Sequence, residues 1–226
     1  VVNGFDENAV EAALLINDAI GANITVLSVG CNFTMDVMKK PLSMGAENLV
    51  LIDDPMLADL DSFATANVLD QAIRKIGQFD LILCGRQASD WDNAMVPIGL
   101  SESLGIPCVT LARNIEVADG GLIVHRSFTD GYEVVEAPLP AVVTVTNELG
   151  EPRYPTLRGI MAASRKAPTV WSASDLGLTA EQLDPKLDLK DLYIPVSDTE
   201  CEFIQGEDEA DAGRLLAMRL REARLI

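Results

Sequence analysis

The sequence predicts a doubly wound α/β fold, in which helices cover both faces of a mostly parallel sheet. Three observations support this prediction: short apolar runs rich in β-branched residues, segments of helical period between them, and a hydrophobic content of 48% that suffices for a sizeable core. A length of 226 residues suits one large domain or two unequal ones. Short apolar runs of this kind are typical of strands that are buried on both faces.

Strand and helix patterns alternate along the first half of the chain. Residues 61–76 form the clearest helix, because apolar residues share one face, the first residue is an aspartate that can cap the helix and Gly77 can end it. Asp6 is the expected cap of the first helix, and Asp92 or Asn93 is expected to open the fourth. The expected helices are residues 6–21, 34–44, 61–76 and 92–104. The expected strands are residues 24–29, 49–52, 80–84 and 108–111.

The alternation is interrupted after residue 120. Two strand-like segments, residues 122–126 and 132–135, flank Thr129-Asp130-Gly131, a sequence typical of a hairpin turn. We therefore expect a β-hairpin insertion in the α/β pattern. Beyond it, the expected elements are a strand at residues 141–146, a helix at 157–164 and a strand at 169–171.

Two regions are expected along the chain. Residues 1–172 carry the α/β pattern, whereas residues 173–226 lose it and end in an amphipathic helix at 207–226. Acidic residues come first in this last helix and arginines follow, which complements the helix dipole. We interpret residues 173–226 as an extended arm that clasps another subunit. Packing of the arm on its own domain is the alternative.

The charge is strongly acidic and unevenly distributed. Thirty-five acidic and 17 basic residues give a formal net charge of −18, which argues against nucleic acid as a partner because phosphate backbones are repelled. Residues 153–166 nevertheless contain four basic residues and no acid. This basic segment is a local anion site, a docking surface for an acidic partner or a solvated helix face, and charge alone leaves all three open.

Several classes of chemistry lack their residues in this sequence. The four cysteines form no CxxC pair and there is one histidine, so the sequence offers neither a zinc ligand set nor a nucleophilic triad. No GxGxxG, GxxxxGK[ST] or GxSxG motif is present. No apolar run is long enough to span a bilayer, and no signal peptide is recognisable. We expect a protein of a reducing compartment, without structural disulfides, catalytic residues, bound metal or membrane insertion.

The strongest candidate for a binding site follows the strand expected at residues 80–84. Ligands of open α/β sheets bind at the carboxyl ends of the strands, and the next nine residues lead from such an end into a helix. Arg86 and Ser89 can donate to an anion, while Asp90 and Asp92 can accept from a ribose or an amine. The alternative is a capped loop whose aspartates only start the helix.

Six stretches spread over the chain form a recognisable combination. They are NGFDENAVE (residues 3–11), LSVG (27–30), GRQASDWD (85–92), LPAVVT with EPRYPTLRGIM (139–144 and 151–161) and EFIQG (202–206). This combination resembles the β subunits of electron transfer flavoproteins, the small subunits of heterodimers that carry electrons from flavin dehydrogenases. The resemblance covers essentially the whole chain. The sequence departs from the family pattern at four positions. Many members have Gln and Gly where this chain has Met95 and Pro97. Asn is common where it has Gly150, and proline is usual where it has Gly4.

The resemblance implies a Rossmann-like fold of the adenine-nucleotide α-hydrolase-like kind that binds AMP in a structural role, or a second FAD in electron-bifurcating members. It also implies a redox FAD that is shared with the α subunit and held mainly by it. The nucleotide-binding residues that it implies are Asn3, Gly4, Phe5, Asp6, Val29, Arg86, Gln87, Ala88, Ser89, Asp90, Asp92 and Asn93. The residues that it implies for docking of flavin-dependent dehydrogenases are Leu157, Arg158, Ile160 and Met161.

Three further expectations come from the resemblance. The family begins with a strand that this sequence lacks, so the first strand of the sheet is expected upstream of residue 1. The C-terminal arm is expected to reach across to the α subunit. The expected location is the cytoplasm, or the mitochondrial matrix if the protein is eukaryotic.

The function implied is that of an electron carrier subunit, not an enzyme, with no chemistry of its own beyond positioning flavin. Two alternatives remain open at this point. One is a bifurcating flavoprotein that oxidises NADH with a second FAD in the nucleotide pocket. The other is a stand-alone adenine-nucleotide sensor, which would fold without a partner and copurify with adenine nucleotide instead of flavin.

Overall fold

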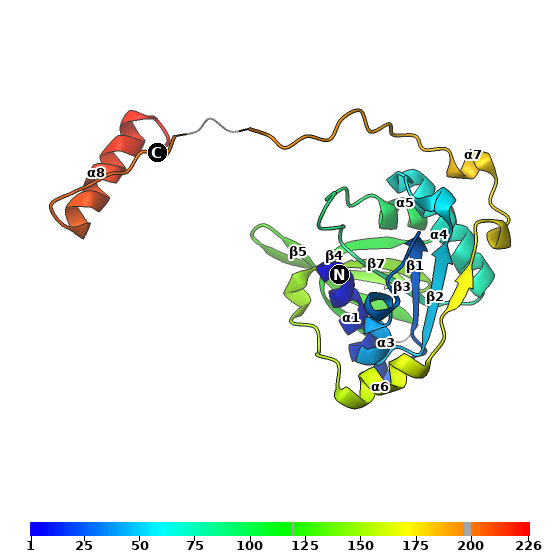
Figure 1. Cartoon of the computed structure of the whole chain (residues 1–226). Coiled ribbons are helices and arrows are strands. Elements are labelled where there is room, and N and C mark those ends of the chain that lie inside the picture. Colours follow the sequence, from blue (N-terminus) through cyan, green and yellow to red (C-terminus); the bar gives the residue numbers. More distant parts are fainter. Residues whose placement is uncertain (119, 197–199) are drawn as a thin grey trace. The chain divides into compact units, whose positions relative to one another are not determined.

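The computed structural model describes residues 1–118, 120–196 and 200–226. These residues divide into two compact units, Val1–Asp188 and Leu189–Ile226 (Figure 1). The first unit contains all eight strands of the described chain. The second contains one long helix, and the two units are described separately below.

The first unit contains two hydrogen-bonded sheets. The three-stranded sheet is parallel and has the order β1-β2-β8. Its strands are β1 (Thr25–Gly30), β2 (Asn48–Asp53) and β8 (Thr169–Trp171). The five-stranded sheet has the order β3-β7-β4-β5-β6. Its strands are β3 (Leu81–Gly85), β4 (Cys108–Ala118), β5 (Gly121–Phe128), β6 (Gly131–Pro138) and β7 (Ala141–Val145). Among the described residues, β1 pairs only with β2 and β3 only with β7, so both are edge strands.

The predicted hairpin is present, and a bulge in β4 makes it possible. The first part of β4 runs parallel to β7, and the second part pairs antiparallel with β5, which continues into β6 through the turn at Thr129-Asp130. The ladder with β7 shifts register between Val109 and Ala112, and the ladder with β5 shifts between Ala112 and Asn114. Within the first shift, Leu111 has a φ of 62° and donates its backbone N–H to Oγ1 of Thr144 at 2.9 Å. Because this bulge redirects the strand, β4 continues to residue 118 instead of ending at 111 as predicted.

Helix α1 (Gly4–Ile20) starts before the predicted residue 6. The prediction that Asp6 caps this helix is wrong. Asn3 occupies the N-cap position, and Asp6 lies in the first turn, where its carboxylate accepts a hydrogen bond from the backbone of Gly85 at 2.8 Å. Helix α4 (Ser62–Ile76) is as predicted: Asp61 accepts from the N–H of Ala64 at 2.8 Å, and the helix ends at Gly77.

Two other helices differ from the prediction because of prolines. The helix expected at 34–44 is divided at Lys39 into α2 (Met35–Met38) and α3 (Lys40–Met44), since Pro41 cannot donate an N–H to a continuous helix and fits only in a first turn. Helix α5 (Val96–Leu104) begins after the predicted Asp92 or Asn93 and carries Pro97 in its first turn. Asp92 and Ala94 have φ values of 51° and 54°, which are incompatible with a right-handed helix.

Helices cover both faces of the three-stranded sheet, as the doubly wound prediction requires (Figure 1). On β2, Leu49 and Leu51 pack with residues of α1, α3 and α6 (Leu157–Arg165), whereas Val50 and Ile52 pack with α4 and α7 (Ala180–Leu183). The alternation follows from the two-residue period of a strand. Helix α1 also packs on the five-stranded sheet, through Ala9 and Ala12 against Val145 of β7.

The first unit extends beyond the predicted domain end at residue 172. Ala173 and Leu183 are buried in the cluster beneath α4, and Asp61 accepts hydrogen bonds from the backbone N–H groups of Lys186 and Leu187 at 2.7 and 2.8 Å. These contacts fix the segment up to Asp188 to the α/β unit, so only residues from 189 onward are separate from it.

The second unit contains α8 (Glu209–Glu222), which lies within the predicted helix at 207–226. Asp208 caps it by accepting from the N–H of Asp211 at 2.7 Å, and Arg219 pairs with Glu202 at 2.9 Å. Residues 197–199 of the predicted arm lie outside the described residues. No helix in the described parts of the chain has the length and apolar character to cross a membrane.

Candidate functional site

The predicted nucleotide loop meets the N-terminus of α1 at the carboxyl end of β3. The contact point is Gly85, whose N–H donates to the Asp6 carboxylate at 2.8 Å. A Cβ atom on Gly85 would lie 2.7 Å from the backbone of Phe5 and of Asp6, closer than side chains approach backbone atoms. Glycine at this position therefore allows α1 to reach the end of the strand. The sequence prediction took Gly85 as the residue that ends the strand and opens the candidate loop, and did not count it among the nucleotide-binding residues.

Asn3 holds the loop against the helix through hydrogen bonds to residues on both sides. Its amide Nδ2 donates to the backbone oxygen of Gln87 at 2.9 Å and to the Asp6 carboxylate at 2.8 Å. Its Oδ1 accepts from both the hydroxyl and the backbone N–H of Ser89, at 2.7 and 3.2 Å. One amide side chain therefore connects α1 to two successive points of the loop.

Arg86 provides the cation of this site and lies over an aromatic ring. Its guanidinium carbon is 5.3 Å from the centroid of the Phe5 ring, within the range of a cation–π contact. Its backbone N–H donates to the oxygen of Val145 at 3.0 Å, and its Nε donates to Oε1 of Gln87 at 3.1 Å. A backbone bond and two side-chain contacts thus orient the guanidinium.

The second half of the loop is held by its own polar groups. Gln87 donates to Asp92 at 2.6 Å, and the N–H of Asp92 donates to the backbone oxygen of Ala88 at 2.9 Å. Asn93 donates to the hydroxyl of Ser62, at the start of α4, at 3.4 Å. Sequence reasoning missed Ser62, because it is distant from the loop in the chain and has no distinctive spacing from it.

Most of the sequence-predicted nucleotide residues therefore lie together, and three are not joined to the network. Val29 lies at the carboxyl end of β1, beside Ile52 in the parallel ladder. Gly4 is the first residue of α1, and Asp90 is exposed. Among the described residues, no side-chain hydrogen bond links Val29, Gly4 or Asp90 to the others.

A second candidate surface is the apolar face of α6, formed by Leu157, Ile160 and Met161. These positions are spaced i, i+3 and i+4, so they share one side of the helix. Their side chains are 76%, 50% and 53% exposed, which is unusual for three neighbouring large apolar residues. Thr156 caps the helix by accepting from the N–H of Gly159 at 3.0 Å. Arg158 is exposed on the same helix turn.

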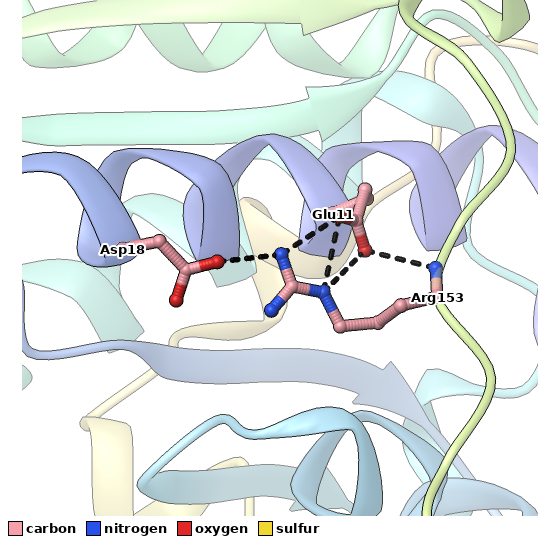
Figure 2. A network of polar contacts seen from close by, with 3 residues as sticks. All are labelled: Glu11, Asp18 and Arg153. Atoms are coloured by element: carbon pink, nitrogen blue, oxygen red, sulfur yellow. Dashed lines mark hydrogen bonds and ion pairs between the residues drawn. The ribbon is translucent and has the colours of Figure 1, made fainter.

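The loop that leads into α6 is bound to α1 by an ion-pair network (Figure 2). The Arg153 guanidinium contacts both oxygens of Glu11 at 2.9–3.1 Å and Asp18 at 2.9 Å. The backbone N–H of Arg153 donates to the same Glu11 carboxylate at 2.9 Å. Glu11 is buried and Arg153 is half-buried. Hydrogen bonding to Glu11, opposed by burial and aided by Asp18, raises the pKa of Arg153 above its ordinary value, so its charge is permanent.

In the described part of the chain, no three His, Cys, Asp or Glu side chains are grouped in a way that could hold a metal ion. The two candidate surfaces differ in chemistry. One is a polar loop with an oriented guanidinium, and the other is an exposed apolar helix face beside a basic residue.

Comparisons with known proteins identify a relationship over the whole chain. Residues 1–176 match the family model described as "Electron transfer flavoprotein domain". The chain is 35% identical over 224 residues to the electron transfer flavoprotein subunit beta of Thermoanaerobacterium thermosaccharolyticum, covering 99% of this chain and 82% of that protein. It is 43% identical over 173 residues to the subunit beta of Megasphaera elsdenii, covering 74% and 64%. It is 34% identical over 230 residues to the Caffeyl-CoA reductase-Etf complex subunit CarD of Acetobacterium woodii, covering 100% and 88%.

The fold and the two surfaces define a doubly wound α/β protein with a polar loop at the carboxyl edge of its strands and an exposed apolar helix face. The comparisons specify this class further. The chain belongs to the electron transfer flavoprotein family, among its beta subunits. The resemblance stated from the sequence is confirmed.

Proposed function

We propose that this beta subunit forms a heterodimer with an FAD-carrying alpha subunit and passes electrons from flavin-dependent dehydrogenases to a downstream acceptor. The FAD supplies the redox chemistry, and the residues of this chain bind and orient. The observation that carries the proposal is the exposure of Leu157, 76%, on a helix whose opposite side is packed on the α/β unit. An apolar side chain presented in this way is suited to insertion into a partner's pocket.

The charges around α6 favour an acidic partner surface. Arg158 and Arg165 are exposed on this helix, and Lys166 follows it, whereas the chain as a whole carries −18. A local positive region on an acidic protein orients the approach of an acidic partner. The partner is attracted to the positive region and is repelled by the rest of the acidic surface. Of the three interpretations of the basic segment, we therefore favour the docking surface.

The expected nucleotide is AMP in a structural role, and the loop between β3 and α5 fits an adenylate. Its cation is the Arg86 guanidinium, whose carbon lies 5.3 Å from the Phe5 ring centroid, and hydrogen bonds of Asn3 to Gln87 and Ser89 hold the loop in place. Asp6 and Asp92 already accept hydrogen bonds from Gly85 and Gln87, so their negative charge is partly balanced within the protein. In this arrangement Arg86 would neutralise the phosphate, and Asn3 would hold the loop around the ligand.

The docking half of the proposal is tested by Leu157→Ala in the heterodimer. Loss of a central apolar anchor is expected to raise the KM for the heterodimer about tenfold in reduction by a flavin-dependent dehydrogenase, with nucleotide content unchanged. Met56→Ala is the matched control, because Met56 is also largely exposed, at 64%, but lies on a different element, Pro55–Leu57. An unchanged KM for Leu157→Ala would contradict the proposal.

A second candidate is a bifurcating flavoprotein that oxidises NADH with a second FAD in this pocket. It is favoured by the 34% identity to CarD, a subunit of a complex that joins a caffeyl-CoA reductase to an Etf. The two candidates differ in flavin stoichiometry. One FAD per purified heterodimer, with AMP released on denaturation, supports the carrier, and two FAD without AMP support the bifurcating enzyme. Membership among beta subunits gives no support to the stand-alone sensor.

A further inference from the structure

The loop that precedes α6 is attached to α1 at two points. Asn8, which is 5% exposed, donates its amide to the backbone oxygen of Gly150 at 2.7 Å. One turn further along α1, Glu11 binds both the backbone N–H and the guanidinium of Arg153 (Figure 2). A carboxylate that binds the main chain and the side chain of one residue fixes the position of that residue and its orientation. Four residues after Arg153, Leu157 begins the apolar face of α6.

Helix α6 is also held along its length and at its far end. Ala163 is buried in one cluster with Leu14 of α1. Gly159 lies against α3 so closely that a Cβ atom would be 2.3 Å from the backbone oxygen of Ser43. Lys39 donates to the oxygen of Ser164 at 3.2 Å. The helix that exposes Leu157 is therefore fixed on its inner side, and the segment before it depends on Asn8 and Glu11.

The pair formed by the Glu11 carboxylate and the Arg153 guanidinium is suited to fixing the orientation of Arg153, in addition to any contribution to stability. A buried carboxylate–guanidinium pair is often no more stabilising than apolar residues of the same size, because both charges lose their hydration. Its distinctive property is directional, since the planar guanidinium binds a carboxylate through two parallel hydrogen bonds. A lysine in place of Arg153 would retain the attraction to the carboxylate, and a glutamine in place of Glu11 would retain the shape of the side chain. Neither would form the two parallel hydrogen bonds that fix the orientation.

We propose that Glu11 is a positioning residue for partner docking: through Arg153 it determines where α6 presents Leu157, Ile160 and Met161. The proposal rests on the proposed docking function of this face. It places the determinant of docking on α1, more than 140 residues away in the sequence.

The test uses the complete heterodimer with Glu11→Gln, which keeps the shape of the side chain, and Arg153→Lys, which keeps the charge. Asp70→Asn is the matched control: Asp70 is also a carboxylate, 4% exposed, bound through both oxygens to an arginine, Arg74, but on α4. The first readout is hydrogen–deuterium exchange of residues 150–165. The second is KM against kcat for reduction by a flavin-dependent dehydrogenase. Should Glu11→Gln fail to fold, Arg153→Lys carries the test.

We expect both α1-network variants to speed exchange at residues 154–161 and to raise KM about three- to tenfold, with kcat and nucleotide content unchanged. Asp70→Asn is expected to lower the melting temperature without changing KM. Unchanged hydrogen exchange in Glu11→Gln would overturn the proposal. It would also be overturned if Leu157→Ala raises KM while Glu11→Gln and Arg153→Lys both leave KM unchanged. If Leu157→Ala leaves KM unchanged, the docking function fails, and faster exchange in Glu11→Gln still supports the positioning of α6.

Discussion

Gly85 lies where two segments 79 residues apart in the sequence touch, the N-terminus of α1 and the end of β3. Its backbone has no positive φ, so its role is spatial and not conformational. The hydrogen bond from its N–H to Asp6 forms only because no side chain separates them. The position of the candidate nucleotide loop, which starts at Gly85, depends on this close approach.

We predict that Gly85→Ala destabilises the protein by about 1–3 kcal/mol, because the new methyl group would displace the first turn of α1. Loss of the Asp6 and Asn3 contacts should also reduce the nucleotide content of the purified heterodimer. Thermal unfolding and quantification of released nucleotide measure the two effects. Gly213→Ala is the control, because a Cβ there meets nothing within 4 Å and should stabilise α8 slightly. Equal behaviour of the two variants would contradict the prediction.

The thiol of Cys84, on β3, is expected to make the free energy of unfolding depend on pH. Burial, with smaller contributions from Asp6 and Cys108, raises the pKa of its thiol from 9.0 to about 12. Between these values the unfolded chain loses the proton and the folded chain keeps it. Since the folded state then binds more protons, the free energy of unfolding falls as the pH rises from 9 towards 12.

We predict that Cys84→Ala flattens this part of the stability profile by up to about 1.4 kcal/mol per pH unit, the slope for one proton. Urea unfolding at several pH values between 8 and 11 measures it. Cys201→Ala is the control, because Cys201 is exposed. Identical slopes in the wild type and Cys84→Ala would show that the thiol ionises normally in the folded protein.

At the scale of elements, α6 depends on its cap, since it has only nine residues and buries one of them. Helices of this length are marginal without tertiary contacts and satisfied termini. Thr156 supplies one such contact through its hydroxyl to the N–H of Gly159.

We predict that Thr156→Ala destabilises α6 by about 1 kcal/mol and speeds hydrogen exchange at its first turn. Thr179→Ala is the matched control, because Thr179 caps α7 in the same way, by accepting from the N–H of Gln182. Each variant should loosen its own helix, and only Thr156→Ala should weaken reduction by the dehydrogenase. A similar loss of reduction in Thr179→Ala would assign the effect to general instability.

Most elements could be predicted from local signals, and the exceptions have specific causes. Periodicity, Asp61 and Gly77 defined α4 at both ends. The start of α5 was predicted too early because Asp92 and Asn93 resemble caps, whereas the chain at Asp92 and Ala94 adopts positive φ. The cap of α1 was assigned to Asp6 because its preference for that position is strong, but its carboxylate is used by Gly85. Asp6 does prefer N-cap positions, but in the folded protein its carboxylate binds the backbone of Gly85 instead of capping the helix.

At the scale of the whole molecule, the two units differ in the source of their stability. The five apolar clusters found among the described residues lie between Ala9 and Leu183, inside the first unit. The second unit contributes α8, whose exposed apolar residues include Leu216 and Met218. The expectation for the C-terminal arm, residues 173–226, was that it reaches across to the alpha subunit, and the exposed apolar residues of α8 are suited to such a contact.

We predict that removal of residues 189–226 changes the melting temperature of the chain by only a few degrees, about the effect of a 1 kcal/mol change, but abolishes stable association with the alpha subunit. Circular dichroism and size-exclusion chromatography with the alpha subunit provide the two measurements. Retained association would refute the clasping role of this segment, and loss of folding would show that it stabilises the first unit.

The sequence by itself determined the α/β class, the order of most elements, the family and the chain segments that carry the two candidate surfaces, because these follow from local periodicity and from motifs read along the chain. Only the tertiary structure decided how those segments are joined. Asn3 with Ser89, Asp6 with Gly85 and Glu11 with Arg153 each connect residues more than 70 positions apart. No local pattern encodes such pairs, since their distance depends on the packing of α1 against both sheets.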